Sequence, residues 1–149
     1  MKTFITTLIL ILLSNISIYA KNSADDIIGL WRTGNGRGLI EIYKASDGTY
    51  QGKIKGGQKR KDKNGNDINL DVNNPDPNLR NRVIHGMVII TKFRFDGDDT
   101  WTDGRIYNPE DGNEYKCKMW MDDINTINLR GYVGISLLGR TEKWTRVKA

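Results

Sequence analysis

Cysteine and histidine are almost absent from this chain of 149 residues, which contains one of each. With Cys117 alone, no disulfide can form within the chain, so a folded domain must be held together by its core. No Cys and His residues have the spacing of a zinc site, and we expect neither a metal nor a cofactor. Cys117 falls on the apolar side of an alternating segment, which favours a small buried hydrophobic side chain over a reactive thiol.

Long hydrophobic runs are also absent after the first 20 residues. The N-terminus has a basic start at Lys2, an apolar run from Phe4 to Leu13, and the small residue Ala20 before a polar segment. This order is typical of a secretory signal peptide, and the apolar run is shorter than the roughly 20 residues of a membrane span. We expect cleavage after Ala20 and one exported domain over residues 21–149, in the periplasm or outside the cell. An uncleaved membrane anchor is the alternative.

A strong charge of one sign is missing as well. Without Lys2, 22 basic and 18 acidic side chains remain, which is a net charge of +4. This mild excess does not favour a nucleic-acid partner, and the one cluster of basic residues lies in a single short segment. That segment is either a solvated loop or a docking patch for anionic envelope polymers or lipid head groups. It contains Lys59, Arg60, Lys61 and Lys63. The sequence does not indicate an oligomeric state.

Helical periodicity is weak, whereas period-two alternation recurs along the chain. Turn signals such as Asp47-Gly48 and Asn108–Gly112 separate the alternating runs. Eight such strands can close and remove exposed edges, so the sequence predicts an all-β, eight-stranded antiparallel up-and-down barrel. A β-sandwich is the alternative. The expected strands cover residues 29–33, 39–44, 49–55, 83–95, 101–107, 114–121, 127–133 and 138–147.

One short helix is expected in the 75–82 region. Asp76 is a suitable N-cap, and Pro77 suits the first helical position. A helix of one or two turns needs support from packing, and we expect Leu79 to anchor it as a plug over one end of the sheet. In the alternative interpretation, the helix is a lid that carries Arg80 and Arg82 toward an anionic ligand group.

An eight-stranded barrel is either filled by side chains or holds one small ligand. Its inner face is expected to be apolar, with three polar candidates at the rim: His85, Arg80 and Arg82. We therefore expect a non-enzymatic protein that binds a small apolar or amphipathic molecule. A structural or interaction protein of the cell envelope, with a filled barrel, is the alternative. The inward candidates are Met87, Ile89, Phe93, Tyr115, Cys117 and Met119.

Catalysis has weaker support. His85 is the obvious acid–base group, but no Ser or Cys accompanies it in a recognisable motif. The residues around Ser136 do not form a nucleophile elbow. A hydrolase that uses His85 is the least favoured hypothesis, and no catalytic residue is assigned.

The segment Gly29-Leu30-Trp31 resembles the Gly-x-Trp signature of lipocalins and related calycins. In those barrels the Trp packs across the closed end beneath an Arg from the last strand. The resemblance therefore implies a cluster of Gly29, Trp31 and Trp144 at one barrel end. Either Arg140 or Arg146 would complete it.

A longer ordered series covers nearly the whole chain after residue 20 and resembles the exported bacterial family called domain of unknown function 2147. The resemblance implies a calycin-like barrel in the periplasm or outside the cell and brings no catalytic residues. Besides Gly29-x-Trp31, the series comprises Tyr50-x-Gly52-Lys53-Ile54, Asn74-Pro75-Asp76, Leu79-Arg80-x-Arg82, His85-Gly86, Gly104-x-Ile106-Tyr107-Asn108-Pro109, Gly112-x-x-Tyr115, Arg130-Gly131-Tyr132-Val133-Gly134 and Leu138-Gly139-Arg140-Thr141-x-x-Trp144.

Overall fold

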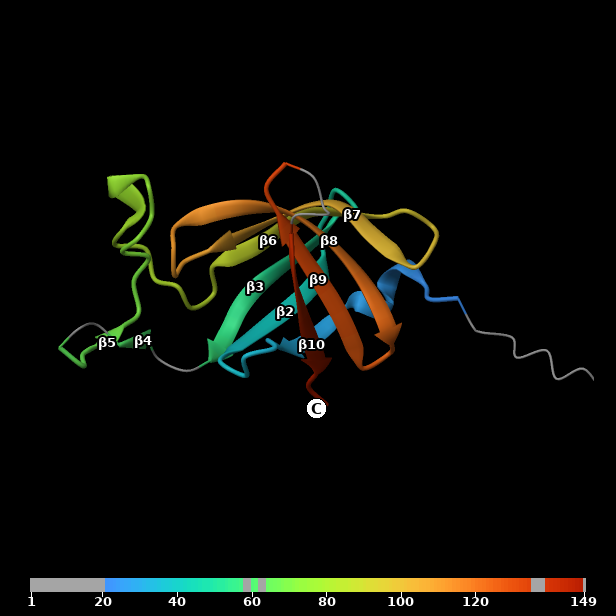
Figure 1. Ribbon diagram of the computed structural model, residues 1–149, viewed down its shortest axis with the longest axis horizontal. Helices are drawn as coiled ribbons and strands as arrows, with labels where there is room; N and C mark the ends of the chain where they lie inside the picture. The colour runs from blue at the N-terminus through green and yellow to red at the C-terminus, as the bar shows by residue number, and fades with distance from the viewer. Residues whose placement is uncertain (1–20, 58–59, 62–63, 135–138, 149) are drawn as a thin grey trace, which may run out of the picture.

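The computed structural model describes residues 21–57, 60–61, 64–134 and 139–148 (Figure 1). The expected signal peptide and two residues of the basic segment, Lys59 and Lys63, lie outside the described residues. Within these ranges, no helix is long and apolar enough to cross a membrane. The elements in chain order are η1 (Ala24–Ile27), β1 (Gly29–Arg32), β2 (Gly38–Lys44), β3 (Tyr50–Gly57), β4 (Arg60–Lys61), β5 (Asp67–Ile68), η2 (Pro77–Leu79), β6 (Val88–Phe95), β7 (Thr100–Asn108), β8 (Asn113–Asp123), β9 (Thr126–Tyr132) and β10 (Arg140–Arg146).

The larger sheet is a closed barrel with the strand order β1-β10-β9-β8-β7-β6-β3-β2. All neighbouring pairs are antiparallel, and closure comes from pairing of β1 with β10, where Trp31 lies opposite Arg146. Closure leaves this sheet without an open edge on which another chain could pair. The predicted eight-stranded up-and-down barrel is therefore confirmed, and a sandwich is not formed. Strands β4 and β5 pair only with each other.

The longest predicted strand, 83–95, is shorter in the structure and begins at Val88. Before it, Gly86 takes a positive φ of 83°, and the backbone N–H of Met87 donates to the Ile84 carbonyl at 3.0 Å. This turn removes the first residues of the segment from the ladder. A glycine suits the turn because it takes a positive φ without steric cost.

The pairing of β6 is locally irregular. The pairing of β3 with β6 changes register beside Gly52, and Lys92 takes a φ of 65°. Irregular pairing of this kind lets two consecutive residues face the same side. Ile89 and Ile90 are consecutive residues of the strand, and both are buried.

Trp31 closes one end of the barrel. Its side chain is fully buried, and its Nε1 donates to the Ile27 carbonyl at 2.9 Å. The Arg146 guanidinium lies over the ring, 4.2 Å from its centroid. The same guanidinium group donates to the backbone carbonyl oxygens of Asp26, Ile28 and Ile124. Arg146 is therefore the arginine that packs on Trp31.

Arg140, the other candidate for that role, lies at the opposite end of β10. It is exposed and pairs with Gly131 of β9. Gly29 does belong to the closed end, since a Cβ there would lie 2.5 Å from Arg146 Nη1. The expectation that Arg140 belongs to the Trp31 cluster is thus corrected by the direction of the last strand.

Side chains fill the half of the barrel next to Trp31. Phe93, Trp101 and Met119 are fully buried there as part of one continuous core. A Cβ at Gly104 would overlap the Phe93 ring, so this glycine makes room for the aromatic core. The closed end is therefore solid, and any ligand must enter from the other end.

The connection between β3 and β6 stands away from the barrel, at the left of Figure 1. We call its described residues, 60–61 and 64–87, the β3–β6 connection. It holds the β4–β5 ribbon and η2, where the Asp76 carboxylate accepts a hydrogen bond from Asn78 N at 2.9 Å. The predicted N-cap is thus confirmed. Leu79 is 39% exposed and η2 buries no residue, so the predicted plug is wrong.

Candidate functional site

The barrel half opposite Trp31 contains a cavity that opens to solvent. Its volume is about 1730 Å³, including the groove that it shares with the β3–β6 connection. This exceeds the roughly 300–1,000 Å³ of a typical small-molecule pocket. The segments around its mouth are the β1–β2 loop, the β7–β8 turn and the first residues of β10.

The inner wall of the cavity is apolar because inward-facing positions of successive strands carry aliphatic side chains. Neighbouring strands keep these positions in register, as in the pairs of Ile40 with Ile54 and of Ile106 with Tyr115. Such a wall favours a hydrocarbon group over water. The apolar and aromatic side chains of the wall are those of Ile40, Ile54, Ile89, Ile106, Tyr115, Leu129 and Trp144, together with Cys117.

Four of the nine residues proposed from the sequence as ligand-binding line this cavity: His85, Ile89, Tyr115 and Cys117. His85 lies in the turn before β6, on the connection side of the mouth. The other three come from β6 and β8. The candidates on β6 and β8 therefore lie in the wall of the cavity. That their side chains contact a ligand stays a prediction.

Three further candidates are buried but do not line the cavity. Met87, Phe93 and Met119 belong to the continuous core, with Phe93 and Met119 fully buried. They support the wall from behind or fill the solid half of the barrel. Alternation alone gives the inward face of a strand but does not say where along the strand the barrel becomes hollow.

The two arginines proposed for a lid make structural contacts instead. Arg80 Nε donates to the Asn74 carbonyl at 2.8 Å. Arg82 donates to the Asp71 carboxylate at 2.8 Å and lies over the Tyr107 ring, 5.9 Å from its centroid. Neither residue lines the cavity, so the structure does not bring them to a ligand.

Asp71 is the centre of a buried polar cluster that fixes the β3–β6 connection to the barrel. The Asp71 side chain is fully buried and accepts hydrogen bonds from Tyr107 Oη at 2.7 Å, Asn74 Nδ2 at 2.7 Å and Arg82. Burial acts to raise the pKa of Asp71, but these hydrogen bonds outweigh it and hold that pKa below the ordinary 3.8. Burial and the Asp71 carboxylate raise the pKa of Tyr107 to about 12. Tyr107 lines the cavity, so this cluster positions part of the mouth.

An ion pair crosses the mouth of the cavity. Arg37 Nη2 in the β1–β2 loop lies 2.9 Å from Glu110 Oε1 in the β7–β8 turn, and both residues line the cavity. In the barrel order, two strands separate these hairpins on either side: β3 and β6 one way, β10 and β9 the other. The hairpins therefore face each other across the opening, and we call the Arg37–Glu110 pair the strap.

The two ends of the strap differ in how firmly they are held. Asn73 Nδ2 donates to the carbonyls of Pro109 and Glu110, at 3.3 and 2.9 Å, which fixes the β7–β8 turn to the β3–β6 connection. Arg37 lies between glycines, of which Gly36 has a φ of 73°. The arginine end of the strap is the end with more conformational freedom.

Cys117 lies in the cavity wall but is not a reactive thiol. Burial raises the pKa of its thiol to about 12. The thiol therefore stays protonated at neutral pH, and the thiolate is the form that reacts as a nucleophile. The prediction that Cys117 is a small buried hydrophobic side chain fits its place in the wall.

Several wall residues were not proposed from the sequence. Ile40 and Ile54 lie on the inward faces of their strands, and the alternation of those strands was a sufficient signal. Trp144 was assigned to the closed barrel end, yet it lines the cavity, and its buried Nε1 has no hydrogen-bond partner among the described residues. Gly131 was the hardest wall residue to predict, because the sequence does not show whether a glycine in a strand faces a cavity or a packed core.

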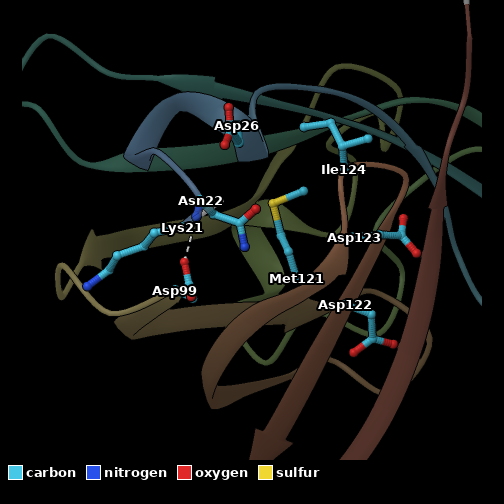
Figure 2. A pocket seen from close by; sticks show the side chains of 8 residues that line it. All are labelled: Lys21, Asn22, Asp26, Asp99, Met121, Asp122, Asp123 and Ile124. Atoms are coloured by element: carbon cyan, nitrogen blue, oxygen red, sulfur yellow. Dashed lines mark hydrogen bonds between the residues drawn. The ribbon is translucent and has the colours of Figure 1, made fainter. Parts of the chain in front are cut away.

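A second, smaller hollow of about 440 Å³ lies at the closed end (Figure 2). Asn22 N donates to Asp99 Oδ1 at 2.7 Å, which holds the N-terminal segment against the β6–β7 turn. Figure 2 shows Asp122 and Asp123 spread apart from Asp99 rather than converging with it. Across the residues that the structure describes, no group of three or more His, Cys, Asp or Glu side chains is placed to hold a metal.

The family model described as "Uncharacterized protein conserved in bacteria (DUF2147)" matches residues 29–146. A similar solved structure is protein HP1028 from the human pathogen Helicobacter pylori, which is described as belonging to the lipocalin family. The two chains are 21% identical, the match covers 81% of this chain and 82% of that one, and the TM-score is 0.69. At 21% identity, this similarity shows that the two chains share a fold, and no more. None of the curated proteins compared with the chain matches it.

Proposed function

This chain belongs to the bacterial family DUF2147, as its motif series predicted, and from that premise we propose that it is an exported carrier of a small apolar or amphipathic molecule. The observation that carries the proposal is the open cavity with its apolar inner wall. Binding sites for small molecules are concave, mostly apolar and equipped with a few polar groups. The lipocalin-like barrel is compatible with such a site.

Catalysis is not part of the proposal. The protonated Cys117 thiol is a poor nucleophile, and His85 makes no side-chain hydrogen bond or ion pair with another described residue. Acid–base catalysis by a histidine usually depends on a group that orients its ring. The carrier function uses the cavity as it is and requires no reaction.

Occlusion of the cavity tests the proposal. Gly131 lies on the inward face, and a Cβ there would meet only Tyr115 Cβ at 3.8 Å and Ile106 Cγ2 at 4.0 Å, both in the cavity wall. Gly131→Phe therefore places a ring in the cavity without disturbing the backbone. We expect it to lower affinity for the neutral probe N-phenylnaphthylamine, followed by fluorescence, by at least about tenfold, which corresponds to about 1.4 kcal/mol.

Val88→Phe is the matched control, because Val88 is 39% exposed on β6 and lies outside the cavity. This variant should bind the probe as the wild type does. Denaturing extraction of freshly purified wild type, followed by mass spectrometry, should release a small molecule that Gly131→Phe lacks. Equal probe affinity for wild type and Gly131→Phe would contradict the carrier function.

A further inference from the structure

The charged side chains at the cavity mouth are largely neutralised by one another. Arg37 pairs with Glu110, and Lys61 pairs with Asp67 at 2.8 Å. All four line the cavity. A charged ligand head would have to displace one of these partners, so neither pair favours a head of one sign.

The remaining charges of the described residues at the mouth do not form a site for an ion either. The carboxylate of Asp111 accepts hydrogen bonds from Tyr115 Oη at 2.7 Å and Asn108 Nδ2 at 3.0 Å. On β10, Arg140 and Glu142 have opposite charges, and Glu142 accepts a hydrogen bond from Gly34 N at 3.0 Å. An anionic head near Arg140 would also lie near Glu142, since every second residue of a strand faces the same side.

Uncharged polar groups on two sides of the mouth keep free hydrogen-bonding capacity. Asn35 uses only its Oδ1, which accepts from Thr33 Oγ1 and Arg37 N, so its Nδ2 remains a free donor among the described residues. Asn73 uses its Nδ2 on the β7–β8 turn, so its Oδ1 remains an acceptor. The Asn69 side chain makes no hydrogen bond with another described residue, so it offers both a donor and an acceptor.

We propose that the ligand is an amphiphile with an uncharged, polyhydroxylated head, such as a sugar joined to a hydrocarbon chain. Hydroxyl groups donate and accept, as do the amides around the mouth, and they need no counter-charge. The hydrocarbon chain lies in the apolar barrel, and the head lies in the groove between the β3–β6 connection and the β7–β8 turn. This inference names the ligand class of the carrier function proposed above and rests on it.

Four probes with the same chain and different heads test the inference: dodecyl maltoside, dodecyl phosphocholine, dodecanoate and dodecyltrimethylammonium. Each displaces N-phenylnaphthylamine from the full mature chain, below its critical micelle concentration. We expect the maltoside to bind at least about tenfold more tightly than the others. Its head can use the free amides without breaking an ion pair and, unlike a carboxylate at Arg140, without lying near Glu142.

A pair of asparagine variants locates the head. Asn69 lines the cavity, whereas Asn81 is exposed on the same connection and does not. Asn69→Leu should lower maltoside affinity by about 2- to 12-fold, the value of one hydrogen bond, and leave dodecanol affinity unchanged. Asn81→Leu should change neither.

The outcomes separate this inference from the carrier function. Tighter binding of dodecanoate, lost in Arg140→Gln, would overturn the inference and leave a carrier of acidic amphiphiles. Equal affinity for all heads, or a preference for the zwitterionic phosphocholine head or the cationic trimethylammonium head, would overturn it as well. If no probe displaces the dye and Gly131→Phe matches the wild type, the carrier function itself fails.

Discussion

Arg140 and Arg146 occupy the same face of β10, yet they differ in burial and in the contacts that they make. The Arg146 side chain is partly buried against Trp31 and holds three backbone carbonyls at the closed end. Arg140 is exposed at the mouth and, among the described residues, has no side-chain hydrogen bond or ion pair. The stability of the barrel should therefore depend on Arg146 and hardly at all on Arg140.

Arg146→Ala is expected to lower the free energy of unfolding by about 2–4 kcal/mol, measured by urea denaturation. The variant loses charge-assisted hydrogen bonds and a cation–π contact, and it leaves buried carbonyls without donors. Arg146→Lys should recover only part of the loss, because an ammonium group cannot reach three carbonyls as a planar guanidinium does. Arg140→Ala is the control and should change stability by less than about 0.5 kcal/mol. Similar losses for both alanine variants would contradict the closed-end assignment.

Asp71 gives a prediction with a defined pH range. Its pKa is lower in the folded protein than the ordinary 3.8, so the carboxylate stabilises the fold above that pH. The contribution is lost as the pH falls below 3.8 and passes through the folded-state pKa. Asp71→Asn should cost about 1–3 kcal/mol at pH 7, because an amide presents N–H groups to donors that need an acceptor.

The pH dependence distinguishes this electrostatic role from simple packing. The stability difference between Asp71→Asn and the wild type should shrink as urea denaturation is repeated at pH values below 3.8. A deficit that stays constant down to the lowest pH at which the wild type folds would assign the loss to shape alone.

At the scale of elements, the strap connects two hairpins that the barrel holds on opposite sides of the mouth. Both of its side chains are half exposed, and such pairs contribute only about 0.2–1 kcal/mol. The strap therefore opens readily and should affect how fast a ligand passes more than how tightly it binds. Salt weakens an exposed pair of this kind.

Arg37→Gln should raise the association and dissociation rates of N-phenylnaphthylamine by up to about fivefold at low ionic strength, in stopped-flow fluorescence. The dissociation constant should change little, and the rate difference should vanish at high salt. Lys61→Gln is the matched control, because it breaks an exposed pair that lies within the β4–β5 ribbon and does not cross the mouth. Charge reversal at both positions, Arg37→Glu with Glu110→Arg, should restore the slow rates. Unchanged rates in Arg37→Gln would refute a gating role.

The strands show which part of element structure follows from local pattern. Short alternating runs with Gly and Asp turns gave the number and order of the barrel strands. The start of β6 was predicted at Val83 instead of Val88, because periodicity does not register the turn at Gly86. The bulge near Lys92 depends on the pairing with the neighbouring strand, and the residues around Lys92 do not by themselves indicate it.

At the scale of the whole molecule, the barrel is solid at one end and hollow at the other. Large aromatic residues fill the closed end, whereas the open end is lined by several isoleucines, Leu129 and Gly131 together with Tyr115 and Trp144. An export route would bring such a carrier to ligands of the cell envelope. We predict that the chain is cleaved after Ala20 when expressed in a bacterium with an intact secretion system.

The intact mass of protein from the periplasmic fraction should equal that of residues 21–149. Lys21 would then be the first residue of the mature chain, and it lies within hydrogen-bond distance of Asp98 at the closed end. A variant with Leu8→Arg and Leu10→Arg should remain in the cytoplasm with its full mass, because charges interrupt the apolar run. Full-length protein in the membrane fraction, and not in the periplasmic fraction, would favour the uncleaved anchor instead.

The sequence by itself determined the all-β barrel, the turns at Asp47-Gly48 and Asn108–Gly112, the Asp76 cap and the family, because each depends on short segments whose side chains act locally. Tertiary structure decided which arginine covers Trp31, where the barrel becomes hollow, which rim charges neutralise each other and how Asp71 fixes the connection. These features join residues that are far apart in the chain, and barrel closure and strand register alone bring them together. A period of two tells which side chains face inward, but only the closed sheet tells what they meet there.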